Sequence, residues 1–240
     1  MFWEQEKDEN SPYVVPDDVV DLVYNISCKC LPLDHAYSFS TAVRAALPWL
    51  ESEARAGIHL IHGAESGNGW MRPEDTENAV LHLSRRSRMT LRVPGHRIED
   101  ARELTGRNLD IDGYSLEVGT AKVKLFSTLS TQFARYVVIP EGVSANDEAA
   151  FMAAAAEQLR DLGIKVRKML CGRAHAIRHP QGDIQTRSIM LADLEAEEAI
   201  ALQQNGIGPH RTLGCGLFIP HKGIKAVHQT ANSRQPDTAS

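Results

Sequence analysis

Residues 206–216 read GIGPHRTLGCG, a segment in which two Gly-x-Gly pairs are separated by five residues. Glycine permits positive φ and lets another backbone approach closely, and exposed amides in such a loop can bind phosphate oxygens. His210 and Arg211 add charge-assisted donors at its centre. The segment follows a predicted helix and leads into a predicted strand, and no Gly-Lys-Ser/Thr ends it, which excludes the Rossmann and Walker loops. Without a ligand, the same spacing would serve as a helix-to-strand turn.

The glycine segment closes the second of two similar runs of predicted elements. In the second run we expect a strand at 135–139, a helix at 145–162, short strands at 165–170 and 174–178, a strand at 187–191, a helix at 194–205 and a strand at 217–219. In the first run we expect strands at 19–26, 57–62 and 79–93, helices at 33–47 and 98–104, and a hairpin around Asp112-Gly113. Each half therefore reads β-α-β-β-α-β, and the predicted fold is α+β with two tandem ferredoxin-like domains.

The predicted domain boundaries follow from this order. Residues 1–17 form an acidic N-terminal tail, 18–130 the first domain, and 131–222 the second domain with its C-terminal glycine-rich loop. The polar tail at 223–240 is expected to be disordered, and the Gly- and Asn-containing stretch 63–78 to be a loop. The two halves share element order and no sequence repeat.

Composition limits the classes of protein that the chain can belong to. Of its 240 residues, 42% are hydrophobic and 24% charged, as in a folded globular protein. No apolar run approaches the roughly 20 residues of a membrane span, and the acidic start is unlike a signal peptide. The four cysteines lack a zinc-like spacing, which together with the missing signal predicts a cytoplasmic protein with reduced thiols. The net charge of −5 argues alone against nucleic-acid binding, but local fields steer a polyanion, and basic residues gather at 85–92 and 165–178.

The glycine segment, in this position, resembles the carboxy-terminal glycine-rich motif of the CRISPR repeat-processing endoribonucleases, the sixth Cas family. The resemblance extends over most of the chain and includes the segments 33–37, 57–59, 83–92 and 213–220. It implies two tandem RRM-like domains that bind a repeat hairpin or single strand and cut it by attack of the RNA's own 2′-hydroxyl on the adjacent phosphate. The implied product carries a 2′,3′-cyclic phosphate, and no metal or other cofactor is required. The implied partner is CRISPR repeat RNA, precursor and mature, with other CRISPR effector subunits left open.

Histidine suits the proton transfers of such a reaction, since its unperturbed pKa of about 6.5 lies near working pH. We expect His35 to act as the base, because the dipole at the start of the first helix disfavours its charged form. His59, on the next strand, is the alternative base, and His62 should point to the opposite face from it. Tyr37 is the third catalytic candidate, and it can share a cleft with His35 only if His35 sits at the helix cap. Asp34 is the expected capping residue.

Basic side chains are expected to hold the RNA backbone. Arg44, Lys29 and Arg211 are candidates for stabilising the phosphate, and the sequence does not rank them. A-form RNA is recognised through backbone contacts of this kind, and the low aromatic content of 6% disfavours base stacking. The RNA-binding residues that we predict are Gly206, Gly208, His210, Arg211, Gly214 and Gly216 of the glycine segment, with Lys165, Arg167, Lys168, Arg173 and Arg178 for the hairpin stem.

Two other functions fit the same sequence. The chain could bind repeat RNA as a non-catalytic subunit, with the glycine segment holding phosphate. Alternatively, it could be a small-molecule enzyme or a dimeric interaction domain of the same fold, since fold alone does not determine function.

Overall fold

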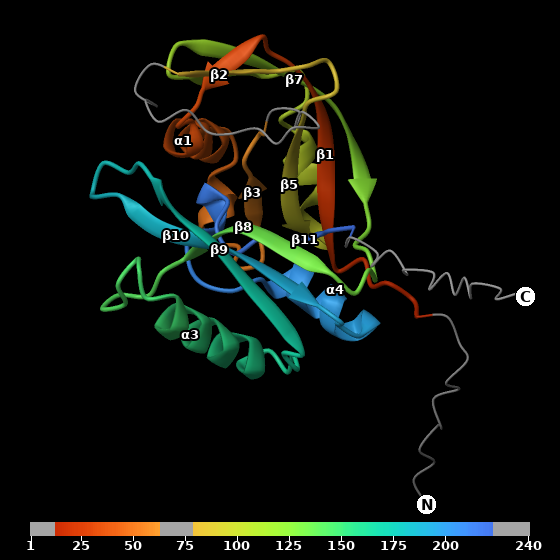
Figure 1. The fold of residues 1–240 in the computed structure, drawn as a ribbon. Coiled ribbons are helices and arrows are strands. Elements are labelled where there is room, and N and C mark those ends of the chain that lie inside the picture. The colour runs from red at the N-terminus through yellow and green to blue at the C-terminus, as the bar shows by residue number, and fades with distance from the viewer. Residues whose placement is uncertain (1–12, 63–78, 223–240) are drawn as a thin grey trace, which may run out of the picture.

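The computed structural model describes residues 13–62 and 79–222 (Figure 1). Three predictions concern residues outside the described ranges: the acidic tail up to residue 12, the loop at 63–78 and the disordered tail at 223–240. The chain forms a mixed α+β fold, as predicted, in which two sheets carry separate hydrophobic cores. Within the described residues, no helix is long and apolar enough to cross a membrane.

The first sheet has the strand order β3-β5-β1-β7-β6, with every neighbouring pair antiparallel. Helix α1 packs its apolar stripe, which includes Phe39 and Val43, into the core of this sheet. The predicted hairpin is confirmed, because Asp112 and Gly113 both take positive φ in the turn between β6 and β7. The elements are β1 (Val19–Ser27), α1 (Ala36–Ala46), η1 (Pro48–Glu51), β3 (Gly57–His59), β5 (Arg88–Pro94), η2 (Gly95–Arg97), α2 (Ile98–Arg102), β6 (Asn108–Ile111) and β7 (Tyr114–Lys124).

The second sheet has the order β11-β8-β10-β9, again antiparallel throughout. Helices α3 and α4 supply Phe151 and Leu202 to its core, and Figure 1 shows α3 below the β9–β10 hairpin, which projects past α1. The elements are β8 (Gln132–Val138), α3 (Glu148–Asp161), β9 (Lys168–Ile177), β10 (Ile184–Ala192), α4 (Ala196–Asn205), η3 (Arg211–Leu213) and β11 (Ile219–Pro220).

Two strand predictions are wrong. The single strand expected at 79–93 is two strands, β4 (Val80–His82) and β5, and β4 pairs with β2 (Cys30–Pro32) in a separate small sheet. The break is a turn in which the Ser87 amide donates to the Ser84 carbonyl at 3.0 Å and the Ser84 amide donates to the Ser87 hydroxyl. Conversely, the two short strands expected at 165–170 and 174–178 form the one strand β9, because its pairing with β10 continues on both sides of a register shift at Gly172.

A buried arginine joins the two sheets. Arg92 is fully buried and donates to both carboxylate oxygens of Asp21, at 2.9 and 3.1 Å, and to the carbonyl of Gln203 in α4 at 2.6 Å. Its guanidinium also lies 4.6 Å from the centre of the Phe126 ring. Burial raises the pKa of Asp21, but the charge and hydrogen bonds of Arg92, together with the nearby His59, outweigh burial and hold this pKa well below its usual range. This network fixes α4, and the glycine segment that follows it, against the first sheet.

Candidate active site

Two grooves meet at a pair of side chains contributed by the two halves of the chain. The first groove, of about 600 Å³, lies between the start of α1 and the β9–β10 turn. The second, of about 580 Å³, lies between α1, η1 and the glycine segment. Tyr37 and His179 line both grooves, and we call this pair the junction. The remaining polar and charged lining residues are Asp34, Ser38, Asp112, Tyr114, Arg178 and Asp183 in the first groove, and Arg44, Glu51, Glu53, His210, Arg211 and Thr212 in the second.

The junction brings a predicted residue together with one that was not predicted. Tyr37 is the second residue of α1 and is 37% exposed. His179 follows β9, and its ring meets the Tyr37 ring edge to face, with the centroids 5.0 Å apart and the planes at 89°. The Gln181 amide donates to Nδ1 of His179 at 3.3 Å. In the neutral ring, this bond places the proton on Nε2.

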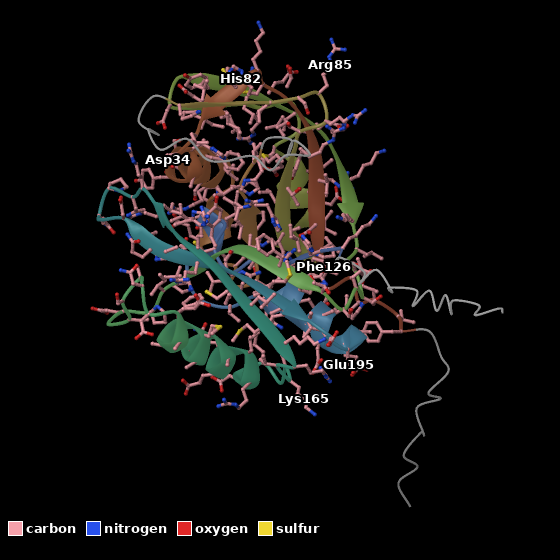
Figure 2. All side chains as sticks on the ribbon, viewed as in Figure 1. Asp34, His82, Arg85, Phe126, Lys165 and Glu195 are labelled. Carbon is pink, nitrogen blue, oxygen red and sulfur yellow. The ribbon has the colours of Figure 1, made fainter. Side chains whose placement is uncertain are left out.

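Guanidinium groups stand on both sides of the junction. In the first groove, Nε of Arg178 lies 3.4 Å from Oδ2 of Asp34. In the second, Arg44 pairs with Glu51, and the exposed His210 takes a left-handed backbone conformation. Figure 2 shows Asp34 at the start of α1, on the side where the β9–β10 hairpin projects. Of the three candidates for phosphate stabilisation, Arg44 is half-buried and lines the second groove. Lys29 is exposed between β1 and β2 and lines neither groove.

His35 stands at the cap of α1, the position that a cleft shared with Tyr37 requires. The prediction of Asp34 as the cap is wrong, because His35 is the N-cap and no side chain caps the helix. His35 is only 4% exposed, and its Nδ1 donates to the Pro32 carbonyl at 2.9 Å, leaving Nε2 buried with no hydrogen-bond partner among the described residues. Burial lowers the pKa of His35, and hydrogen bonds to the carbonyls of Pro32 and Leu33 partly offset this shift. The ring lines neither groove.

The expectation that His59 and His62 face opposite ways is wrong. Strand β3 ends at His59, so strand alternation does not continue to His62, and the two residues line one small cavity of about 70 Å³ beside Tyr136. His59 Nε2 lies 3.6 Å from Oδ1 of Asp21. Burial lowers the pKa of His59, and the Asp21 charge acts in the opposite direction. His59 is thus part of the buried network between the sheets and lines neither groove.

The glycine segment packs mainly against protein. Gly206, Gly208, Gly214 and Gly216 all have positive φ. A Cβ on Gly206 would collide with the carbonyl oxygen of Gly216, one on Gly216 with that of Ile207, and one on Gly214 with the Leu60 side chain. Only Gly208 has open space around it among these four. The middle of the segment, residues 208–213, lines the second groove, and Gly208 is the one glycine of these four that does so.

Arg211 is bound inside the protein. Its Nε donates to the Ala56 carbonyl at 3.1 Å, its Nη2 to the carbonyls of Arg55 and Gln204 at 3.0 and 3.1 Å, and its Nη1 to that of Asn205. These acceptors come from both halves of the chain. Four of the five guanidinium N–H groups are therefore committed to protein carbonyls, which favours a structural role over the predicted contact with RNA.

The predicted basic run is divided between two places. The Arg167 guanidinium lies 2.5 Å from the carboxylate of Glu198 in α4 and 3.3 Å from that of Glu195, the N-cap of α4. The Lys168 ammonium lies 2.9 Å from the carboxylate of Asp193. Figure 2 shows Lys165 beside Glu195 at the end of the molecule away from Asp34. Arg173 is exposed on β9, the edge strand of the second sheet, and Arg178 is the one residue of the five that lines either of the two grooves.

His179 is the groove residue that sequence reasoning missed. The turn between β9 and β10 includes Gly182, which takes positive φ. A histidine three residues before that glycine carries no signal of its own, because only the tertiary packing of the β9–β10 turn against α1 brings it to Tyr37. Within the described residues, no group of three or more His, Cys, Asp or Glu side chains is arranged to hold a metal ion.

The sequence matches one protein family and one curated relative over most of its length. Residues 20–223 match the family Cas6, described as Cas6 Crispr. A curated relative from Myxococcus xanthus (strain DK1622), named CRISPR-associated endonuclease Cas6, is 30% identical over 201 residues, which cover 84% of this chain and 81% of the relative.

Solved structures with this fold share little sequence with the chain. A CRISPR associated protein Cas6 superposes with a TM-score of 0.58 at 10% identity, covering 85% of this chain and 100% of that one. A structure titled "An RAMP protein binding different RNA substrates" gives a TM-score of 0.57 at 16% identity, with the same coverage of 85% and 100%. The resemblance predicted from the glycine segment is therefore confirmed. The family match and the curated relative both span most of the chain, which belongs to the Cas6 family of CRISPR-associated endonucleases.

Proposed function

We propose that this protein is a metal-independent endoribonuclease that cuts CRISPR precursor RNA within its repeats to give mature crRNA. Membership of the Cas6 family supports the reaction class, and a protein of the same fold is described as binding RNA. The observation that carries the proposal is the junction. Two grooves, each large enough for nucleotides, meet at Tyr37 in the α1 segment where the catalytic residues were predicted.

The proposed reaction needs one base, one acid and no external nucleophile. The 2′-hydroxyl loses its proton to the base, its oxygen bonds to the adjacent phosphorus, and the bond from phosphorus to the 5′-oxygen breaks. The leaving 5′-oxygen takes up a proton, so the products are a 2′,3′-cyclic phosphate and a 5′-hydroxyl. His35 is the base that we favour, because it stands at the start of α1 two residues before Tyr37 and its Nε2 has no hydrogen-bond partner among the described residues. Tyr37 meets the RNA at the junction, and His59 remains the alternative base.

The RNA is proposed to follow the two grooves. Gly208 and His210 stand at the glycine end of the second groove, and Arg178 stands on the hairpin side of the first. Arg173 and the residues 165–168, along β9 and before it, would contact the backbone of a hairpin stem. Arg44 is the phosphate-stabilising residue that the geometry favours over Lys29.

The architecture is proposed to be two tandem ferredoxin-like domains, 18–130 and 131–222. The main strands of the first sheet run β7-β1-β5-β3 and those of the second run β11-β8-β10-β9. Both give the spatial order fourth, first, third, second for a β-α-β-β-α-β chain. Other CRISPR effector subunits stay open as further partners.

One incubation tests the function. The protein is mixed with the repeat RNA of its neighbouring array in EDTA, and the products are resolved beside an identical RNA with a 2′-deoxy nucleotide at the cut. We expect cleavage of the first RNA, a cyclic phosphate end, and no cleavage of the second. RNA that is bound but left uncut would favour the non-catalytic subunit. Binding that is absent, or independent of salt, would favour the small-molecule or dimerisation alternative.

A further inference from the structure

His179 lies at the point where the scissile phosphate of the proposed reaction would bind. It belongs to the second half of the chain, yet it contacts Tyr37 of α1 and lines both grooves. The other histidines considered for catalysis, His35 and His59, line neither groove. An RNA strand that passes from one groove to the other must therefore pass His179.

The hydrogen bonding of His179 decides what its ring can do. Nδ1 accepts the amide proton of Gln181 at 3.3 Å, and the amide of Gly182 donates to the His179 carbonyl at 3.0 Å. The turn thus holds both the backbone and the ring, and the neutral ring keeps its proton on Nε2. A ring held in this way donates one hydrogen bond from Nε2 and cannot accept a proton at Nδ1 without losing the Gln181 bond.

The charges around the junction suit a phosphate at this point. Arg178 and Arg44 lie on either side of the junction, in the first and second grooves. Both arginines are ion-paired, Arg178 with Asp34 and Arg44 with Glu51, so a phosphate here displaces these carboxylates. The other acidic residues that line the grooves are Asp112, Asp183 and Glu53. A phosphorane at the junction would therefore have a guanidinium on each side and an N–H donor from His179.

We propose that His179 is a catalytic residue that donates a hydrogen bond from Nε2 to a non-bridging oxygen of the scissile phosphate. This inference rests on the proposed function and deepens it. His179 transfers no proton; it stabilises the charge that grows on the phosphorane oxygens. The active site is then composite, with the proton acceptor on α1 and the oxyanion donor on the β9–β10 turn.

Two substitutions separate donation from packing. His179→Phe keeps an aromatic ring against Tyr37 but has no N–H, whereas His179→Gln keeps an N–H donor. Loss of one preorganised donor slows cleavage about 10²- to 10³-fold, so we expect that loss in His179→Phe and a partial recovery in His179→Gln. Both variants should bind the 2′-deoxy RNA like the wild type. His221→Gln, in an exposed histidine after β11, is the matched control with unchanged cleavage.

Phosphorothioate RNAs test the contact without relying on a variant. In the wild type, sulfur at one of the two non-bridging positions of the cut should slow cleavage about tenfold more than sulfur at the other, since sulfur accepts the hydrogen bond poorly. His179→Phe should remove this difference. Cleavage by His179→Phe within about threefold of the wild-type rate, or equal rates for the two phosphorothioates in the wild type, would overturn the proposal.

The leaving group provides a second way to refute the contact. An RNA with sulfur in place of the leaving 5′-oxygen needs no protonation there, so it should leave the defect of His179→Phe in place. Full recovery on this RNA would make His179 the acid and overturn the proposed contact. A wild-type protein that cuts no repeat RNA would instead refute the endoribonuclease function itself.

Discussion

The glycine segment and the β9–β10 turn both reach the second groove, but they differ in what their residues contact. Gly206, Gly214 and Gly216 pack against neighbouring protein atoms, and Arg211 binds protein carbonyls. In the β9–β10 turn, by contrast, His179 faces both grooves. The segment with the stronger sequence pattern thus mainly builds the fold, while the plainer segment reaches the junction. A pattern of glycines reports a constraint on the backbone, and that constraint can serve packing as well as binding.

The largest expected effect tests whether His35, at the start of α1, is the base for cleavage. His35→Ala should slow cleavage of repeat RNA about 10²- to 10⁴-fold, the usual contribution of a positioned base. Burial lowers the pKa of His35. Its neutral, proton-accepting form therefore persists even when the pH falls to the pKa of an ordinary histidine. The wild-type rate should therefore stay level from pH 8 down to about 6.5 and decline only at lower pH. Measured rates of His35→Ala that match the wild type would transfer the role of base to His59.

The next effect concerns stability. Gly216→Ala forces a side chain into left-handed backbone and against the Ile207 carbonyl, so it should lower the free energy of unfolding by about 4 kcal/mol, the sum of backbone strain and overpacking. Gly163→Ala is the matched control, because Gly163 also has positive φ but open space around it, and it should cost about 1 kcal/mol. Urea unfolding measures both. Equal losses would mean that the glycine segment is not closely packed.

Arg211→Met tests the same region for RNA contact. Removing the guanidinium leaves carbonyls of both halves without donors, and we expect a loss of about 3 kcal/mol in the free energy of unfolding. If Arg211 bound a phosphate, the slope of log affinity against log salt would also fall by about 1. We expect no change in that slope. A reduced slope with unchanged stability would restore the original prediction for Arg211.

Local patterns predicted most of the fold. The β-branched run at β1, the alanine-rich α3 and the Asp112-Gly113 turn each identify their element, because the signal lies within a few residues. Of the two strand errors, one fell at a local turn inside an apolar run and the other where pairing with a distant strand decides the outcome. Ser84 and Ser87 close a turn within a run that reads as one strand, and β9 continues through Gly172 because β10 pairs with it on both sides.

The site was less predictable than the fold, because contacts between distant parts of the chain form it. Tyr37 was predicted because it stands near the start of a recognisable helix, whereas His179 reaches it from 142 positions later in the chain, and no local pattern encodes that approach. The orientation of His62 depends on where β3 ends. The burial of His35 depends on the residues of the second half that pack against the start of α1.

The smallest expected effect tests whether the β9–β10 turn contacts RNA as the grooves suggest. Arg178 is exposed, lines the first groove and has an ion pair at 3.4 Å with Asp34, which a phosphate can replace. Arg178→Ala should weaken binding of 2′-deoxy repeat RNA about fivefold and reduce the salt slope by about 1. Arg107→Ala removes an exposed arginine that lines neither groove and should leave both quantities unchanged. If both variants bind alike, the turn holds the junction in place without gripping the backbone, and the RNA path must follow the second groove alone.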